Sequence, residues 1–198
     1  RTRPKVREVF KGLWDTNELI VSFDGSCYIP KSLKKKDKIW THTDQAPGKL
    51  GRHCIQGYVA LTSNKERTFV CYEGTHRIHE KYFADRGIKK GKDWQLIEHD
   101  FVESMKDYKK INNVTAGSLV LWDSRVFHQN QYGKPGSEER IVQYVCYLPK
   151  NHPKNTMAMR KKRLKYFKER RTTSHWPCPI KVNGKQGRNF GNERLRIN

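Results

Sequence analysis

Residues 117–122 and 141–148 are the two segments that most constrain the fold, because each is rich in aliphatic, aromatic and β-branched residues. Such runs are typical of β-strands. Three shorter runs of the same kind cover residues 19–23, 55–61 and 68–72. The polar turn between the last two predicts that they form a hairpin. Several short strands separated by turns predict a β-sandwich or barrel with peripheral helices.

Helices are expected at the edges of this β-rich region. Apolar residues recur at helical spacing over residues 6–14, which predicts a short amphipathic helix. A second helix is expected to end before Gly87, and a third is expected over residues 101–108.

Positive charge dominates the composition, with 41 Lys and Arg against 20 Asp and Glu and a formal net charge of +21. Solubility does not require so much charge, so a polyanionic partner is plausible. Nucleic acid is the leading candidate, and an anionic membrane surface or a phosphorylated substrate is drawn by the same field.

The charge is concentrated in the stretch that begins at Lys150 and ends at Arg171, which contains ten Lys or Arg residues and one acidic residue. We expect a basic helix there, either as a site for nucleic acid or another polyanion or as a solvated surface. The expected organisation is therefore a β-rich core over residues 1–149 and a basic C-terminal extension over residues 150–198. The extension is expected to be a helix plus a loosely ordered tail, packing on the core.

The cysteines indicate the compartment. Five widely spaced cysteines without a C-x-x-C pair favour reduced thiols and an intracellular protein. No apolar run approaches the length of a membrane span, and the first residues lack the hydrophobic segment of a signal peptide. We expect a soluble protein without a transmembrane segment.

Trp40, His42 and Asp44 lie two residues apart. In an extended segment their side chains therefore leave the same face, and His42 and Asp44 can share one metal ion. His128 follows the strand at residues 117–122 and would complete the set. Two imidazoles and one carboxylate leave coordination positions open for an oxo acid and dioxygen, which suits Fe(II). A His-x-Asp pair also occurs by chance in proteins without a metal.

Arg140 opens the strand that follows His128, and a hairpin-like return would place it on the neighbouring strand. A guanidinium there can pair with the distal carboxylate of 2-oxoglutarate while the other end of that molecule chelates iron. The alternative is a surface arginine paired with Glu138 or Glu139. Gln56 either hydrogen-bonds the bound oxo acid or faces outward from its strand.

Five motifs occur in order along the chain: W-T-H-T-D (residues 40–44), I-Q-G-Y-V-A-L (55–61), E-G-T-H-R (73–77), G-S-L-V-L-W-D-S-R-V-F-H-Q-N (117–130) and R-I-V-Q-Y (140–144). Over roughly residues 19–148 the sequence resembles the phytanoyl-CoA dioxygenase family.

The resemblance implies a mainly β protein with peripheral α-helices, built as a double-stranded β-helix of two sheets with iron at its open mouth. It also implies that His42, Asp44 and His128 hold the iron and that Arg140 binds the 2-oxoglutarate carboxylate. Such a protein is an Fe(II)- and 2-oxoglutarate-dependent dioxygenase, which hydroxylates a C–H bond of a small-molecule substrate and yields succinate and CO2.

The sequence departs from the family pattern at Val142, where many 2-oxoglutarate enzymes have a hydroxyl, and the usual N-terminal helical region is largely missing. Asp44 is retained, so no ligand position is vacated for halide, which favours hydroxylation over halogenation.

Two other functions fit a barrel. One is a non-catalytic nucleic-acid-binding protein, and the other is a cupin-like metalloprotein that does not use 2-oxoglutarate. Arg140 discriminates against the last of these.

Overall fold

A computed structural model of the protein describes residues 1–181, so the tail expected from Asn183 lies outside the described residues. The chain divides into two compact units, one of residues 26–144 and one of residues 1–25 together with those from 145 onward. The expected division into residues 1–149 and 150–198 stays a prediction. Within the described residues, no helix is long and apolar enough to cross a membrane.

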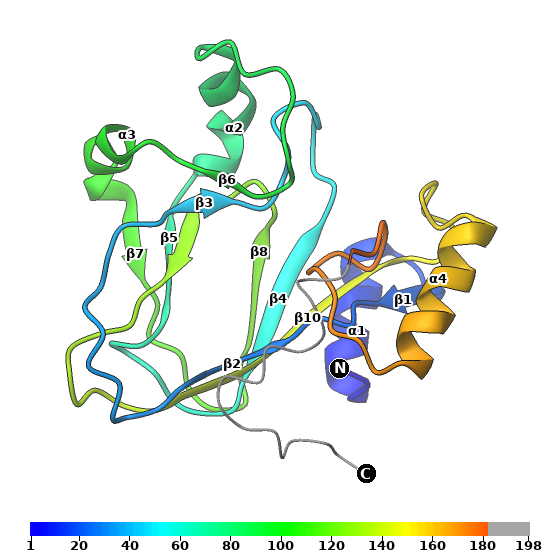
Figure 1. Cartoon of the computed structure of the whole chain (residues 1–198), viewed down its shortest axis with the longest axis horizontal. Coiled ribbons are helices and arrows are strands. Elements are labelled where there is room, and N and C mark those ends of the chain that lie inside the picture. Colours follow the sequence, from blue (N-terminus) through cyan, green and yellow to red (C-terminus); the bar gives the residue numbers. More distant parts are fainter. Residues whose placement is uncertain (182–198) are drawn as a thin grey trace. The chain divides into compact units, whose positions relative to one another are not determined.

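Two antiparallel sheets form the unit of residues 26–144 (Figure 1). The first sheet has the core order β2, β10, β4, β8, and the second has the order β3, β9, β5, β7, with β6 added beyond β3. The strands are β2 (Ser26–Ile29), β3 (His42–Thr43), β4 (Ile55–Ala60), β5 (Phe69–Tyr72), β6 (Gln95–Leu96), β7 (Lys109–Ile111), β8 (Leu119–Asp123), β9 (His128–Asn130) and β10 (Arg140–Pro149).

Successive strands cross between the sheets. From β2 to β5, and again from β8 to β10, each strand lies in the sheet opposite to that of its predecessor. Two four-stranded antiparallel sheets connected in this way form a jelly roll. The fold is therefore the mainly β, double-stranded β-helix that the sequence predicted.

The predicted hairpin of β4 and β5 is wrong. Strand β4 pairs with β8, whereas β5 pairs with β7 and β9 in the other sheet. The polar residues between β4 and β5 therefore carry the chain across the sandwich. The expected hairpin-like return from β9 to a neighbouring β10 is also wrong, because β9 and β10 lie in different sheets. Polar turn residues mark where a strand ends, but the burial of both sheets decides which strand it pairs with.

Aromatic rings fill the space between the sheets. Phe69 of β5 lies with its ring centroid 4.8 Å from that of Trp122 in β8 and 6.3 Å from that of Tyr58 in β4. Val142 of β10 is buried in the same cluster. These contacts join one sheet to the other, so the interior of the sandwich is a packed core.

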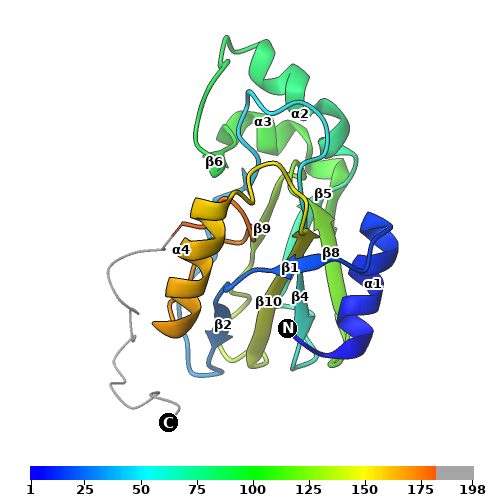
Figure 2. The same cartoon turned by 90° about the vertical axis from the view of Figure 1, so that its right-hand side faces the viewer.

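Two helices lie together with β6 at one end of this unit (Figures 1 and 2). They are α2 (Thr75–Ala84), which begins after the left-handed Gly74 and ends before Gly87 as predicted, and α3 (His99–Ser104), which the 3-10 turn Lys106–Tyr108 follows. Their apolar residues form a second core cluster that includes Phe83, Val102 and Phe127. The helices are thereby packed around the segment that leads into β9.

The other unit contains α1 (Pro4–Trp14), β1 (Leu19–Val21), the last residues of β10 and α4 (Met157–Lys168). Helix α1 has proline in its first turn, where the missing N–H costs nothing. Strand β1 pairs with β10, with Leu19 opposite Pro149. Thr156 caps α4 by accepting a hydrogen bond from the Met159 amide at 3.3 Å.

Helix α4 is the basic helix that the composition predicted, but its arginines anchor it. Arg163 donates to the Val21 carbonyl at 2.8 Å, and its guanidinium lies over the Phe23 ring. Arg160 donates to the Asn155 carbonyl at 3.1 Å. The exposed cations of the helix are Arg160 and four lysines, namely Lys161, Lys162, Lys165 and Lys168.

Truncation of Phe83, which is 2% exposed in the helix cluster, should be strongly destabilising. We expect Phe83→Ala to lower the free energy of unfolding by about 3–5 kcal/mol, because it removes a buried ring and leaves a cavity. Chemical denaturation measures the loss. Tyr108→Ala is the control, since Tyr108 is 57% exposed and its loss should cost less than about 0.5 kcal/mol. Equal losses in the two variants would contradict the assigned packing.

Candidate metal centre

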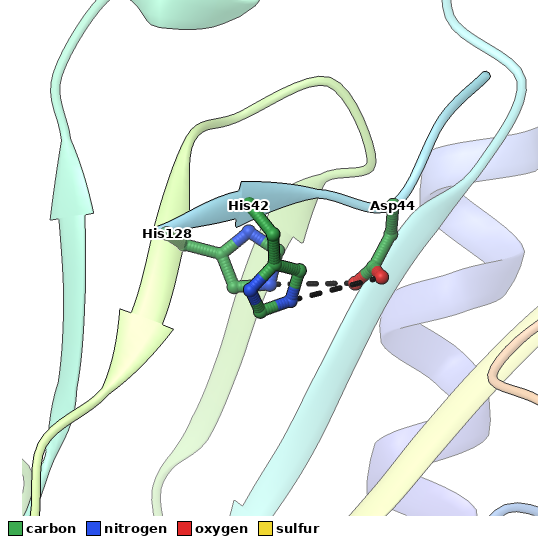
Figure 3. Close-up of side chains that lie close together, drawn as sticks. All are labelled: His42, Asp44 and His128. Atoms are coloured by element: carbon green, nitrogen blue, oxygen red, sulfur yellow. Dashed lines mark ion pairs between the residues drawn. The ribbon is translucent and has the colours of Figure 1, made fainter. Parts of the chain in front are cut away.

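His42, Asp44 and His128 are brought together at one point of the sandwich (Figure 3). His42 in β3 is the direct pairing partner of His128 in β9, and Asp44 follows β3 immediately. Directly opposed residues of antiparallel strands project to the same face, as do residues two apart on one strand. The nitrogen and oxygen atoms that the three side chains offer lie within 4.8 Å of one another, and all three residues are buried.

The imidazoles are oriented with Nε2 toward the centre. His42 Nδ1 lies 3.2 Å from the Trp40 carbonyl, and His128 Nδ1 lies 2.8 Å from the Val126 carbonyl. A carbonyl can only accept, so each Nδ1 carries the proton and each Nε2 presents a lone pair. The distance from Nε2 to the Asp44 carboxylate is 3.8 Å for His42 and 3.3 Å for His128. Histidines that bind metals have this arrangement, with the second ring nitrogen held by a carbonyl or carboxylate.

Backbone and side-chain hydrogen bonds fix the segment that carries Asp44. The Ser124 carbonyl, at the end of β8, accepts from the Asp44 amide and from the Thr43 hydroxyl, each at 3.0 Å. The Ser124 hydroxyl in turn donates to the Gln45 side chain at 2.9 Å. Because Thr43, Gln45 and Ser124 are fully buried, water does not compete for these bonds.

Gln45 is the centre of this network. Its Nε2 donates to the carbonyls of Lys49 and Gly51, both at 2.7 Å, and its Oε1 also accepts from the His53 amide at 3.2 Å. The Gln45 carbonyl accepts from His79 Nε2 at 3.0 Å. Burial lowers the pKa of His79, which keeps this ring neutral. Sequence reasoning missed Gln45, and its place directly after the His-x-Asp pair is the only sequence signal that singles it out.

Arg140 lies on the opposite sheet from His128 and is fully buried. In the pairing of β10 with β2, Arg140 lies opposite Ile29. Its Nη1 atom lies 3.4 Å from Cys27 Sγ, and its Nη2 atom has no hydrogen-bond partner among the described residues. The guanidinium carbon lies 5.3 Å from the centre of the Tyr58 ring. Arg140 therefore points into the sandwich rather than standing beside His128 in a hairpin.

Arg140 is not a surface arginine paired with Glu138 or Glu139, which was the alternative to a role in the interior. Glu138 accepts hydrogen bonds from the amides of residues 65–67 instead, and no carboxylate of residues 1–181 lies within ion-pair distance of Arg140. Burial acts to lower the pKa of Arg140, but Tyr144, Cys27 and Tyr58 outweigh it and raise that pKa. The guanidinium is therefore a buried positive charge without an anionic partner among the described residues.

Gln56 faces the interior and not the solvent, with 1% of its surface exposed. It lies opposite Trp122 in the pairing of β4 with β8. Both polar atoms of the Gln56 amide and the Trp122 indole nitrogen are buried without a hydrogen-bond partner among the described residues. Leaving a buried polar group unsatisfied costs about 1–3 kcal/mol, so this interior suits a polar ligand better than an apolar filling.

Ring contacts connect this polar interior to the histidines. The Trp122 ring centroid lies 5.4 Å from that of His128 and 6.1 Å from that of Tyr58, over which Arg140 lies. The candidate metal ligands and the buried guanidinium are thus connected through the rings of Trp122 and Tyr58. The donor set fits a divalent transition metal, and the guanidinium fits a carboxylate.

No family model matches the chain. A curated relative, Ava biosynthesis cluster protein O of Aspergillus versicolor, is 30% identical over 166 residues, which are 76% of this chain and 53% of the relative. The chain therefore spans about half the length of the curated relative that it matches. Membership of the phytanoyl-CoA dioxygenase family stays a prediction.

Among solved structures, the chain is similar to HygX from Streptomyces hygroscopicus. With nickel, 2-oxoglutarate and hygromycin B bound, HygX aligns with a TM-score of 0.44 and 10% identity over 74% of this chain and 62% of HygX. With iron bound, it aligns with a TM-score of 0.36 and 13% identity over 65% of this chain and 60% of HygX. At this level of likeness no residue role is transferred from HygX to the chain.

Loss of the Gln45 side chain should loosen the metal centre. We expect Gln45→Ala to weaken Mn(II) binding by about 10–100-fold, which is typical when a residue that orients a ligand is removed. The amplitude of the free Mn(II) electron paramagnetic resonance signal measures the affinity, and circular dichroism verifies the fold. Gln131→Ala is the matched control, because Gln131 bonds the Glu66 carbonyl at 2.8 Å and touches no residue of the network. Equal Mn(II) affinities in the two variants would exclude a positioning role for Gln45.

Proposed function

We propose that the protein is an Fe(II)- and 2-oxoglutarate-dependent oxygenase that hydroxylates a C–H bond of a small molecule. The observation that supports this most is a convergent His42, Asp44 and His128 set in the same sandwich as the buried Arg140, which has no carboxylate partner among residues 1–181. A dicarboxylate with an oxo group at one end matches both: that end suits a metal, and the far carboxylate suits a guanidinium.

In this proposal His42, Asp44 and His128 hold iron, and Arg140 binds the distal carboxylate of 2-oxoglutarate. Gln56 hydrogen-bonds the oxo acid, which would satisfy an amide that otherwise has no partner. Iron held there with 2-oxoglutarate would supply the oxidising chemistry, which takes one oxygen atom of dioxygen to the substrate and the other to the oxo acid as it becomes succinate and CO2.

Tyr58 offers the hydroxyl that the family pattern places at Val142. Val142 is buried in the apolar cluster and has no polar atom in its side chain. The buried Tyr58 ring lies beneath the Arg140 guanidinium, so its hydroxyl is the available second donor to a carboxylate held by Arg140.

The protein's own residues have three tasks. The carbonyls of Trp40 and Val126 hold the two imidazoles with Nε2 inward. The rings of Trp122 and Phe69 limit water around His128, which strengthens electrostatic contacts in the interior. Because Asp44 is present, both imidazoles and the carboxylate occupy metal positions, and none is vacated for halide. This donor set favours hydroxylation over halogenation.

A nucleic-acid or other polyanion partner for residues 150–171 is the rival proposal from another class. The exposed lysines of α4 would supply a salt-dependent attraction to phosphates. Arg163 of that helix is instead half-buried and bound to the Val21 carbonyl, which makes it less available to a phosphate on that surface. The buried donor set favours the oxygenase.

The first prediction of this function concerns iron with 2-oxoglutarate. Without oxygen, addition of both to the protein should give the weak visible charge-transfer band of an iron-bound oxo acid. We expect Ala at position 42, 44 or 128 to abolish the band, because each variant removes one ligand of the set. His99→Ala is the control, since the His99 side chain is 66% exposed and should leave the band unchanged. Retention of the full band in all three ligand variants would refute the assignment.

The second prediction separates the cosubstrate from the metal. We expect Arg140→Ala to weaken 2-oxoglutarate binding by about 2–5 kcal/mol, because it removes a buried charged partner, and to leave Mn(II) affinity near normal. Arg140→Lys should restore binding in part, since an ammonium keeps the charge but not the two-pronged geometry. Isothermal titration calorimetry on the Mn(II)-loaded protein measures both, with the exposed Arg77→Ala as control. Unchanged 2-oxoglutarate affinity in Arg140→Ala would exclude the proposed role of Arg140.

A further inference from the structure

Two large apolar side chains beside the candidate metal centre are half exposed. Trp94, just before β6, is 48% exposed, and its ring centroid lies 5.3 Å from that of His42. Leu96 in β6 is 54% exposed and is the direct pairing partner of His42. Both are placed by the same short pairing of β3 with β6 that positions one candidate ligand.

The register fixes the side of the sheet to which these side chains project. Leu96 pairs with His42, and His42 pairs with His128, so the three residues share one face of the second sheet. Trp94 lies two residues before Leu96 and contacts the His42 ring, which places it on that face as well. The ligand face of the sheet thus continues into exposed apolar surface at its β6 edge.

The segment that carries Trp94 is held in place. The Asp93 carboxylate accepts from the Ala46 amide at 3.3 Å and from the Lys49 side chain. Gly48 approaches the Lys89 carbonyl so closely that an added Cβ would lie 2.7 Å from that oxygen. The residues just after Asp44 are therefore packed against the Trp94 segment. The apolar surface is preformed beside the ligands and does not depend on a mobile loop.

The same segment is positively charged. Lys89, Lys90 and Lys92 are all exposed, and Asp93, the acidic residue between positions 86 and 97, is engaged by Lys49. An anionic group near this surface would meet lysines without competition from a neighbouring carboxylate in the segment.

We propose that Trp94 and Leu96 form an apolar wall that holds the apolar body of the substrate beside the metal, while the lysines of residues 89–92 attract an acidic group on it. The substrate class is therefore a small organic acid with an apolar chain or ring. This inference rests on the proposed function, because it takes the triad as the reacting centre. Large exposed apolar side chains next to a reactive site are typical of binding surfaces, whereas scattered ones need no explanation.

The test uses Mn(II)-loaded protein saturated with 2-oxoglutarate, so that a carboxylate probe cannot take the place of the cosubstrate. Three probes separate the two features: octanoate has an apolar chain and a charge, 1-octanol has the chain alone, and acetate has the charge alone. Paramagnetic relaxation of the probe protons reports their proximity to Mn(II), and its dependence on probe concentration gives the affinity.

Octanoate is expected to bind more tightly than 1-octanol, and acetate is expected to show no measurable relaxation. The protons of the octanoate chain should relax more strongly than those next to its carboxylate, because the chain lies against the wall and the acid points to the lysines. Trp94→Ala and Leu96→Ala should each weaken octanoate binding by about tenfold, since each removes a large apolar contact. A triple Lys89→Gln, Lys90→Gln, Lys92→Gln variant should weaken binding of octanoate but not of 1-octanol.

Ile111→Ala is the matched control, because Ile111 is an apolar residue of β7, in the same sheet, and is 48% exposed. The apolar wall would be refuted if octanoate bound equally well to the Trp94→Ala, Leu96→Ala and Ile111→Ala variants. It would also be refuted if the octanoate protons next to the carboxylate relaxed most strongly. A change of oligomeric state in Trp94→Ala, seen by size-exclusion chromatography without a change in octanoate affinity, would assign the surface to a second copy and overturn the inference. If the protein fails to bind Mn(II) at the triad, the proposed function itself fails. If Mn(II) and 2-oxoglutarate bind normally but the octanoate protons show no paramagnetic relaxation, the apolar wall is refuted and the proposed function is not affected.

Discussion

The pairing of His42 with His128 between β3 and β9 is the contact on which the candidate centre depends. Strand β3 is only two residues long, so its own ladder cannot hold a ligand in place. The Ser124 carbonyl supplies the missing restraint by accepting from both Thr43 and Asp44. A buried carboxylate that faces two imidazole lone pairs is costly unless a proton or a cation lies between them. The fold thus creates a place that a cation stabilises.

The second constraint is that the interior is polar at two separated positions. One sheet carries the histidines and Asp44, and the other carries Arg140 and Gln56. Between them lie the rings of Trp122, Phe69 and Tyr58, which pack the two sheets against each other. A ligand that satisfies both positions must offer a metal-binding group at one end and an anion at the other. The buried guanidinium therefore restricts the cosubstrate more than the metal ligands do, because many oxo acids and waters complete a triad but few carry a second carboxylate.

The sequence predicted that His42 and Asp44 lie together because their spacing is local: a period of two on a strand places them on one face whatever the strand pairs with. His128 has no such local signal, and the ordered motifs of the family resemblance add it to the set. The predicted position of Arg140 on a strand beside His128 is wrong, since β9 and β10 belong to different sheets. Pairing partners far apart in sequence are set by how both sheets bury their faces, and one sequence does not show that. Gln45 was not predicted from the sequence, for a related reason. Two of its partners, His79 and Ser124, lie on segments that only the folded chain brings to it. The other three lie within eight residues, on a loop whose closure around the Gln45 side chain the sequence does not show.

Net charge alone does not show which cations are available to a ligand. The net charge of +21 drew attention to residues 150–171, yet Arg163 and Arg160 of α4 are bound to backbone carbonyls and serve to fix that helix. A cation whose donors are satisfied by carbonyls has less to offer a phosphate than one that projects into solvent. Lys89, Lys90 and Lys92 are fewer, but they are exposed and lie in the segment that ends at Trp94, next to His42. Electrostatic attraction falls with distance and is screened over about 10 Å at ordinary salt. In the proposed function, three lysines in the segment that reaches the triad therefore bear more directly on substrate choice than the net charge of the whole chain.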